Sequence, residues 1–282
     1  MDKELDTDPS CLNEGWQNEL IQGDWCTQGP LRINEHLSLD ALQASVLFTN
    51  ARLILSKIEQ LGGVELTGSG GIASPALNSI NRLLWWGNDG EYRQEWSRNA
   101  EGEPRPVELL RRALELMGAL VHHGTRLIVS PKGVVSQAPS EAGPLYADLL
   151  RTYFRRIDHS SIDGGPPIPL TWSHLGCALH AIGQTETSWC ETTAFISKLF
   201  PVTVFEREVQ ELGASRPGLT WRTEALHSLV VCRFLEPLLD FALLEGRLEA
   251  RPPGVNVWMW RRGTLFGQVL RFELEEESGT QR

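Results

Sequence analysis

The chain has 282 residues, of which 41% are hydrophobic, enough to bury one large core or two to three small ones. Its formal charge of −10 disfavours DNA binding without sequence preference, because such binding depends on neutralising phosphates. No apolar run approaches the roughly 18 to 20 residues that span a bilayer, and the N-terminus lacks a secretory signal pattern. We therefore expect a cytoplasmic protein with no membrane contact.

The negative charge concentrates near the N-terminus. Residues 1–40 carry nine acidic and two basic side chains, a balance of −7, which leaves −3 of the total −10 for the rest of the chain. We expect residues 1–37 to form an acidic, solvated arm. The five cysteines are odd in number and contain no C-x-x-C pair. They indicate reduced thiols and neither a disulfide framework nor a zinc ribbon.

Apolar residues at helical spacing dominate the next part of the chain. One stripe begins behind a predicted serine N-cap at Ser38, and a second ends at Gly62 and Gly63. A short strand is predicted at 64–66, and Ser74 is predicted to cap a helix that has a proline in its first turn. The glycine-rich stretch between them contains no lysine, so it favours turns over a phosphate-binding loop.

A similar order of features returns further along the chain. Residues 107–135 again contain a helix, a glycine and a short β-rich run, which ends in V-S-x-x-G where the first copy has L-T-x-x-G. We therefore expect residues 38–157 to form two helical, winged-helix-like units, with a loop at 86–106. A second loop rich in Gly, Pro and Asp, at 158–169, predicts a boundary between domains.

Residues 170–282 are expected to contain a helical segment and a C-terminal winged-helix-like unit. The helical pattern at 225–246 is predicted to be interrupted at Pro237, and strand alternation follows a Pro-Pro-Gly turn at 252–254. Thr264 is predicted to cap a last short helix. Helix, β-hairpin and short helix form the C-terminal half of a winged-helix unit. The predicted fold class is mainly α: a helical protein with two or three small β-hairpins, in tandem winged-helix-like units.

Three groups of residues carry a resemblance to a known family. They are N-A-R-L-I-L-S-K-I-E-Q-L-G-G-V-E-L-T at 50–67, the segment at Tyr153 and Phe154 with a helical hairpin around Trp189, and residues 234–245 leading to 261–267. Their order resembles that of uncharacterised bacterial proteins carried as passengers by insertion elements and plasmids. The family usually has Gly-Asn-Leu after the L-T turn, where this chain has Gly-Gly-Ile at 70–72. The resemblance implies the architecture and a mobile-element context, and no activity.

A cluster of arginines and tryptophans on the predicted hairpin is the main candidate site. Guanidinium and aromatic groups on one strand face would contact the phosphates, sugars or bases of a nucleic acid. The residues of this predicted nucleic-acid site are Arg247, Arg251, Trp258, Trp260, Arg261 and Arg262. In the alternative, the tryptophans pack on the preceding helix, and the arginines shield them or pair with acidic residues at 273–277. Two arginine pairs, at 111–112 and 155–156, would extend one basic track if the units align their faces.

Other clusters of reactive side chains favour structural roles. His174, Cys177 and His180 have the spacing of two or three metal ligands on one helix, but that helix is apolar nearly all round, which favours buried core residues. Glu206 and Glu208 lie in a charged run and are expected on a solvated face. No hydrolase, metalloprotease or kinase motif is present. We therefore predict no catalytic residue, no cofactor and no metal site.

The sequence leaves three functions open. The first is a non-enzymatic protein that binds nucleic acid, DNA in particular, through its C-terminal wing in a mobile-element or regulatory setting. The second is an interaction module that recruits another protein, in keeping with ten tryptophans and an acidic arm. The third is an enzyme with a dispersed site near His174 and Cys177. The oligomeric state is left open.

Overall fold

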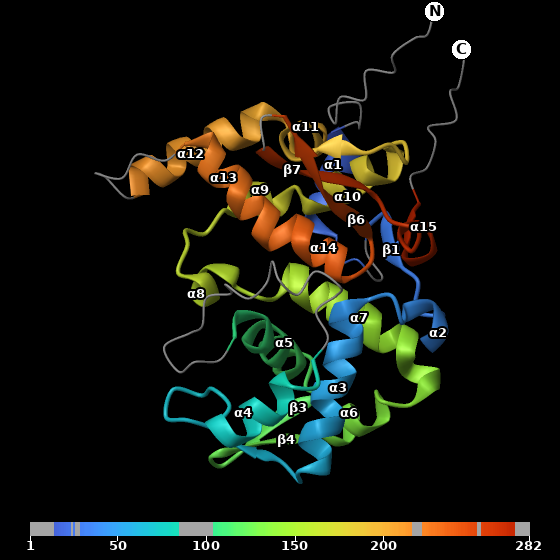
Figure 1. The fold of residues 1–282 in the computed structure, drawn as a ribbon. Helices are drawn as coiled ribbons and strands as arrows, with labels where there is room; N and C mark the ends of the chain where they lie inside the picture. Colours follow the sequence, from blue (N-terminus) through green and yellow to red (C-terminus); the bar gives the residue numbers. More distant parts are fainter. Residues whose placement is uncertain are drawn as a thin grey trace, which may run out of the picture. The chain divides into compact units, whose positions relative to one another are not determined.

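A computed structural model describes residues 14–23, 25, 29–84, 104–215, 222–252 and 255–273 (Figure 1). The chain divides into two compact units. Unit 2 comprises Glu35–Pro167 and Asp240–Ala242, and the described residues of unit 1 lie within 14–34, 168–239 and 243–273. The division after Pro167 falls inside the loop predicted at 158–169. Most of the loop predicted at 86–106, and residues 1–13, 24 and 26–28 of the predicted arm, lie outside the described residues. The prediction of a solvated arm is wrong for its described part, because Leu20, Trp25 and Leu31 are buried.

Unit 2 is mainly helical with one small sheet. Its elements in chain order are α2 (Leu39–Leu42), α3 (Val46–Gln60), β2 (Val64–Glu65), α4 (Ser74–Asn81), α5 (Arg105–Leu116), β3 (Leu120–His123), β4 (Arg126–Val129), α6 (Pro131–Val135), a 3-10 turn (Pro139–Glu141), α7 (Ala142–Arg155) and α8 (His159–Asp163). Helices α3, α5 and α7 pack against one another, and α8 packs against α5. Their apolar faces form the core of this unit.

The helix boundaries of unit 2 follow most of the local signals in the sequence. The Ser38 hydroxyl accepts a hydrogen bond from the N–H of Ala41, which confirms the predicted N-cap. Helix α3 ends before Gly62 and Gly63, both at positive φ. The predicted cap at Ser74 is wrong by one residue, because α4 begins at Ser74 itself and no side chain caps it.

The sheet of unit 2 joins segments that were predicted to belong to separate units. Strand β2 pairs with β4, Val64 opposite Leu127, and β4 pairs with β3 in an antiparallel hairpin. The strand order is β2-β4-β3. The structure therefore differs from the prediction of two units within 38–157: one three-stranded sheet serves the whole segment.

A cluster of aromatic rings anchors the residues around Phe241 in unit 2. The Phe241 ring lies 5.5 Å from the Tyr146 ring and 5.8 Å from the Tyr153 ring, both edge-on. The buried Tyr146 hydroxyl donates a 2.8 Å hydrogen bond to the Phe241 carbonyl. Because this bond satisfies the hydroxyl without water, the cluster fixes both the ring and the backbone of Phe241.

Unit 1 has more helices and two small sheets. Its elements are α1 (Glu14–Gln22), β1 (Leu31–Ile33), α9 (Pro169–Ser173), α10 (Leu175–Gln184), β5 (Cys190–Glu191), α11 (Thr192–Leu199), α12 (Val202–Ser215), α13 (Thr223–Val230), a π-helical turn (Val231–Leu235), α14 (Glu236–Asp240), β6 (Leu244–Arg251), β7 (Val255–Arg262), α15 (Phe266–Val269) and β8 (Leu270–Phe272). Strands β5, β7 and β6 form an antiparallel sheet with β7 in the middle, and β1 pairs with β8.

Two local predictions for unit 1 are wrong. The helical run does not break at Pro237, because the chain widens into a π-helical turn just before it and the N–H of Glu236 bonds to the carbonyl of Val231. A wider turn accommodates a proline that has no N–H of its own. Thr264 does not cap α15, whose N-cap is Leu265 and which has no side-chain cap.

The corner between helix and hairpin repeats in the two units. After α5, Gly118 has a φ of 73°, and the N–H of Ala119 bonds back to Leu114. After α14, Ala242 has a φ of 59°, and the N–H of Leu243 bonds back to Leu238. Both corners end the helix in the manner of a Schellman motif.

The same corner also sets the start of each hairpin. Ala119 accepts a bond from the N–H of Ser130, and Leu243 accepts one from the N–H of Gly263. In both three-stranded sheets the strand that comes last in the chain lies in the middle. The protein is thus mainly helical with small sheets of two or three strands, as predicted at that level. No helix among the described residues has the length and apolar character to cross a membrane.

The corner generates a paired stability prediction. Ala242→Gly is expected to stabilise the protein by about 0.5 kcal/mol, because a Cβ at positive φ costs more than the extra chain entropy of glycine. Gly118→Ala is expected to destabilise it by about 1 kcal/mol, although a Cβ there meets nothing within 4 Å. Urea unfolding of both variants measures the effects; equal and same-sign shifts would exclude backbone strain as the cause.

Candidate interaction surface

The register of the β5-β7-β6 sheet sorts its side chains onto two faces. Because side chains alternate along a strand, residues of one parity on β6 share a face with their partners on β7. Gly246 is opposite Trp260 and Leu248 is opposite Trp258, whereas Arg247 is opposite Met259. We call the face of Arg247 the charged face and the face of Trp260 the apolar face.

The two tryptophans of the predicted site lie on the apolar face. Their rings stack with centroids 5.6 Å apart, and Trp260 is only 1% exposed. Its Nε1 donates to the Thr192 hydroxyl at 2.9 Å, at the start of α11. A Cβ on Gly246 would meet both rings at 3.3–3.4 Å, so a glycine is needed where the rings cross β6. The expectation that the tryptophans share a face with the surrounding arginines is therefore wrong for Arg247, Arg251 and Arg261.

The charged face carries three ion pairs. Arg261 Nε donates to Glu245 at 2.8 Å, directly across the strands. Arg247 contacts Glu249 at 3.1 Å, and Arg251 contacts Glu191 of β5 at 2.9 Å. Three arginines thus oppose three glutamates, and the formal charges of these six residues cancel. The arginines pair with glutamates of the sheet itself; Glu273 pairs instead with Arg32, at 3.5 Å.

Trp189 covers the centre of the charged face. The guanidinium of Arg247 lies 4.4 Å from the Trp189 ring centroid and that of Arg261 lies 4.5 Å from it. Each contact is a cation–π interaction worth about 0.5–1 kcal/mol at a surface. Met259 is 7% exposed between these groups, and its sulfur lies 3.8 Å from an Arg251 nitrogen. An aromatic ring and oriented arginines therefore lie together on one surface, with Met259 buried beneath the sheet's charged side chains.

The structure accounts for every residue of the predicted nucleic-acid site. Arg247, Arg251 and Arg261 lie on the charged face, and the two tryptophans lie on the apolar face. Arg262 bonds through Nη1 to the carbonyl of Gly183 on α10. Sequence analysis missed Trp189 and the paired glutamates. The alternation E-x-R-x-E-x-R at 245–251 was the available signal, since period two on a strand puts all four side chains on one face.

His174, Cys177 and His180 each have a separate structural partner. His174 Nδ1 lies 2.9 Å from the Leu170 carbonyl, and the His180 ring lies edge-on to Phe272. Cys177 is 5% exposed, and burial raises the pKa of its thiol to about 11, which suppresses thiolate reactivity. Burial also lowers the pKa of His180. Within the ranges that the structure covers, no group of three or more His, Cys, Asp or Glu residues is placed to hold a metal ion.

Glu208 is the main exception to the predicted solvated face on α12. Glu206 is exposed, but Glu208 is 1% exposed and packs toward α9. Its Oε2 accepts a 2.7 Å hydrogen bond from the N–H of Thr171. Its Oε1 and the Thr171 hydroxyl have no hydrogen-bond partner among the described residues. Burial raises the pKa of the Glu208 carboxyl above its usual value.

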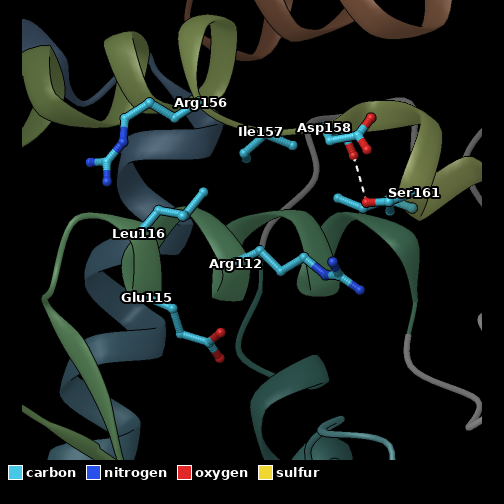
Figure 2. Close-up of a pocket in the computed structure, with 8 residues that line it drawn as sticks. Arg112, Glu115, Leu116, Arg156, Ile157, Asp158 and Ser161 are labelled. Atoms are coloured by element: carbon cyan, nitrogen blue, oxygen red, sulfur yellow. Dashed lines mark hydrogen bonds between the residues drawn. The ribbon is translucent and has the colours of Figure 1, made fainter. Parts of the chain in front are cut away.

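A separate cavity of about 370 Å³ lies in unit 2 between α5 and α8. Figure 2 shows which segments line it: Arg112, Glu115 and Leu116 come from α5, and Arg156, Ile157, Asp158 and Ser161 come from the segment that faces α5. One member of each predicted arginine pair therefore reaches this cavity. Arg112 is already bound to Glu108 at 2.8 Å, and Glu115 and Asp158 also line the walls. The lining mixes both signs of charge and does not form a basic track.

Glu208 generates a prediction on pH. A carboxyl whose pKa is raised by folding contributes stability that is full below its unfolded pKa, near 4.5, and is lost as the pH rises through the folded value. Glu208→Gln is therefore expected to melt a few degrees higher than wild type at pH 7–8, with the difference shrinking toward pH 4.5. Glu206→Gln, on the same helix but exposed, is the control and should show no such trend in thermal melts across pH.

The two sides of the sheet generate a second prediction. Trp260→Ala is expected to cost about 3–5 kcal/mol, because it empties a buried site. Trp189→Ala is expected to cost about 1 kcal/mol, since its ring loses only surface contacts with two arginines. Guanidinium chloride unfolding of both variants checks the assignment, and comparable losses would contradict the placement of Trp189 on the surface.

Comparisons with protein-family models, with curated proteins and with solved structures find no match for this chain. The resemblance to passenger proteins of insertion elements therefore remains a prediction carried by the motifs quoted above. The function proposed below therefore rests on the contacts between the described residues of this chain.

Proposed function

We propose that this protein is a non-enzymatic binding module that recruits another protein through the charged face of unit 1. The observation that carries the proposal is the contact of the Trp189 ring with the guanidinium groups of both Arg247 and Arg261. Tryptophan and arginine are enriched in protein interfaces and dominate their binding energy. Internal pairing with glutamates orients the arginines before a partner arrives, which reduces the entropy lost on binding.

The architecture supports a binding role. Each unit combines helices, a hairpin and a short strand that joins the hairpin from earlier in the chain. We propose that each unit is a winged-helix-like unit and that the two are tandem copies. The repeated helix–hairpin corners, at Gly118 and Ala242, support the same relationship. Folds of this kind carry their function in surface residues and not in the fold itself.

Nucleic-acid binding through the same hairpin remains a prediction, and it differs from protein binding in its expected dependence on salt. Arginines that bind phosphates release counterions, so affinity falls steeply with salt. On this hairpin a phosphate has to compete with the carboxylates of Glu245, Glu249 and Glu191 for the arginines. The internal pairing therefore favours a protein partner over a nucleic acid.

The proposal predicts a selective loss of binding. Immobilised wild type and Val202→Ala are expected to retain the same proteins from a lysate of the source cells, whereas Trp189→Ala retains them at least tenfold less, as expected for a hot-spot residue. Val202 is a matched control because it is 61% exposed and lies on α12, away from the sheet. Quantitative mass spectrometry of the retained proteins is the measurement.

A duplex-binding titration separates the two functions. Fluorescence anisotropy with a mixed-sequence duplex, over a salt series, should show no binding at 150 mM salt if the partner is a protein. Steep salt-dependent binding that is lost when Arg251, Arg261 and Arg262 become alanine would overturn the proposal in favour of nucleic acid.

A further inference from the structure

Strand β6 presents a long open edge. It pairs with β7 along its full length, from Leu244 opposite Arg262 to Arg251 opposite Val255. On its other side, no strand in the part of the chain that the structure describes pairs with it. Arg247, Ala250 and Arg251 are exposed. An uninterrupted edge of this length offers a row of backbone donors and acceptors to another strand.

The hydrogen-bond pattern identifies the residues that face outward. The N–H of Gly263 donates to Leu243 at 2.9 Å, which makes these two residues a hydrogen-bonded pair at the base of the hairpin. Such pairs alternate in an antiparallel ladder, so the odd-numbered residues of β6 bond to β7. The backbone groups of the even-numbered residues therefore point away from β7. Gly246, Leu248 and Ala250 are partly or fully exposed and form the open edge, whereas Leu244 is buried.

The side chains of the charged face alternate in sign along this edge as Glu245, Arg247, Glu249 and Arg251. If a second β6 lies antiparallel with the two-fold axis at Leu248, Glu245 meets Arg251 and Arg247 meets Glu249 of the second copy. All four cross-strand contacts are then between opposite charges, and the four side chains share these contacts with their ion-pair partners within the same chain.

Neighbouring registers do not share this property. A two-fold axis at Arg247 places arginine against arginine and Glu245 against Glu249, and an axis at Glu249 places glutamate against glutamate and Arg247 against Arg251. Like charges directly opposite are destabilising, so the pattern excludes these two registers. Axes at Gly246 or Ala250 also oppose glutamate to arginine, but with two such contacts where the axis at Leu248 has four. On the apolar face the register about Leu248 sets Leu248 against Leu248 and the small residues Gly246 and Ala250 against each other.

We propose that the protein forms a two-fold symmetric dimer in which the β6 strands of two copies pair antiparallel about Leu248. The hydrogen-bonded pairs are Leu248 with Leu248, and Gly246 with Ala250 in both directions. The two three-stranded sheets become one sheet of six strands, β5-β7-β6-β6-β7-β5, and neither copy keeps an open β6 edge. The inference rests on strand register and charge alone and holds whether or not Trp189 binds a further protein.

The test is the mass in solution of the full chain, by light scattering and sedimentation velocity over a concentration series. Wild type is expected to be a dimer. Arg247→Glu places glutamate against glutamate at two symmetry-related positions and is expected to raise the dimer dissociation constant at least tenfold. Adding Glu249→Arg to that variant restores opposite charges across the axis, and the double variant is expected to dimerise again.

A second variant acts on the backbone alone. Ala250→Pro removes an outward N–H that β7 does not use, and proline is tolerated on an edge strand. It is expected to be monomeric with the far-ultraviolet circular dichroism of wild type. A wild type that stays monomeric, a dimer that survives both Arg247→Glu and Ala250→Pro, or a double variant that stays monomeric although folded would each overturn the proposal. Pairing of β6 only with an extended peptide of another protein would do so too.

Discussion

The register of the β6-β7 hairpin is the constraint on which the surface of unit 1 depends. A slip of one residue would exchange the two faces, bury three arginines and expose Trp258 and Trp260. The bond from Gly263 to Leu243 fixes the first pair, and Gly246 leaves the space that the two indole rings occupy. Local backbone geometry at one end of the hairpin therefore determines whether the arginines or the tryptophans are exposed.

The corner that fixes this register has a counterpart before the β3-β4 hairpin, where Gly118 occupies the position that Ala242 has before the β6-β7 hairpin. A single left-handed residue turns the chain from helix into strand, and a bond from the end of the hairpin closes the corner. The two hairpins differ in length: the strands have four residues in unit 2 and eight residues in unit 1. The longer hairpin extends beyond its corner, and its strands supply the charged face and the open edge of β6.

The ion pairs on the charged face favour binding of a protein over binding of a nucleic acid. Arg251 and Arg261 each have a carboxylate at about 3 Å, and Arg247 and Arg261 also stack on Trp189. An arginine held in this way is a directional donor for a protein partner, but it offers less free charge to a phosphate backbone. Elsewhere in the unit, burial disfavours the thiolate form of Cys177 and the protonated form of His180.

The sequence by itself determined the helical class, the cap at Ser38, the glycine stop after α3 and the C-terminal hairpin, because each depends on contacts within a few residues. It also contained the alternation of glutamate and arginine on β6. Only the tertiary structure decided that β2 and β4 share a sheet, that Glu208 is buried and that Trp189 lies over the arginines. These features join residues dozens of positions apart, and local periodicity carries no information on which distant segments meet.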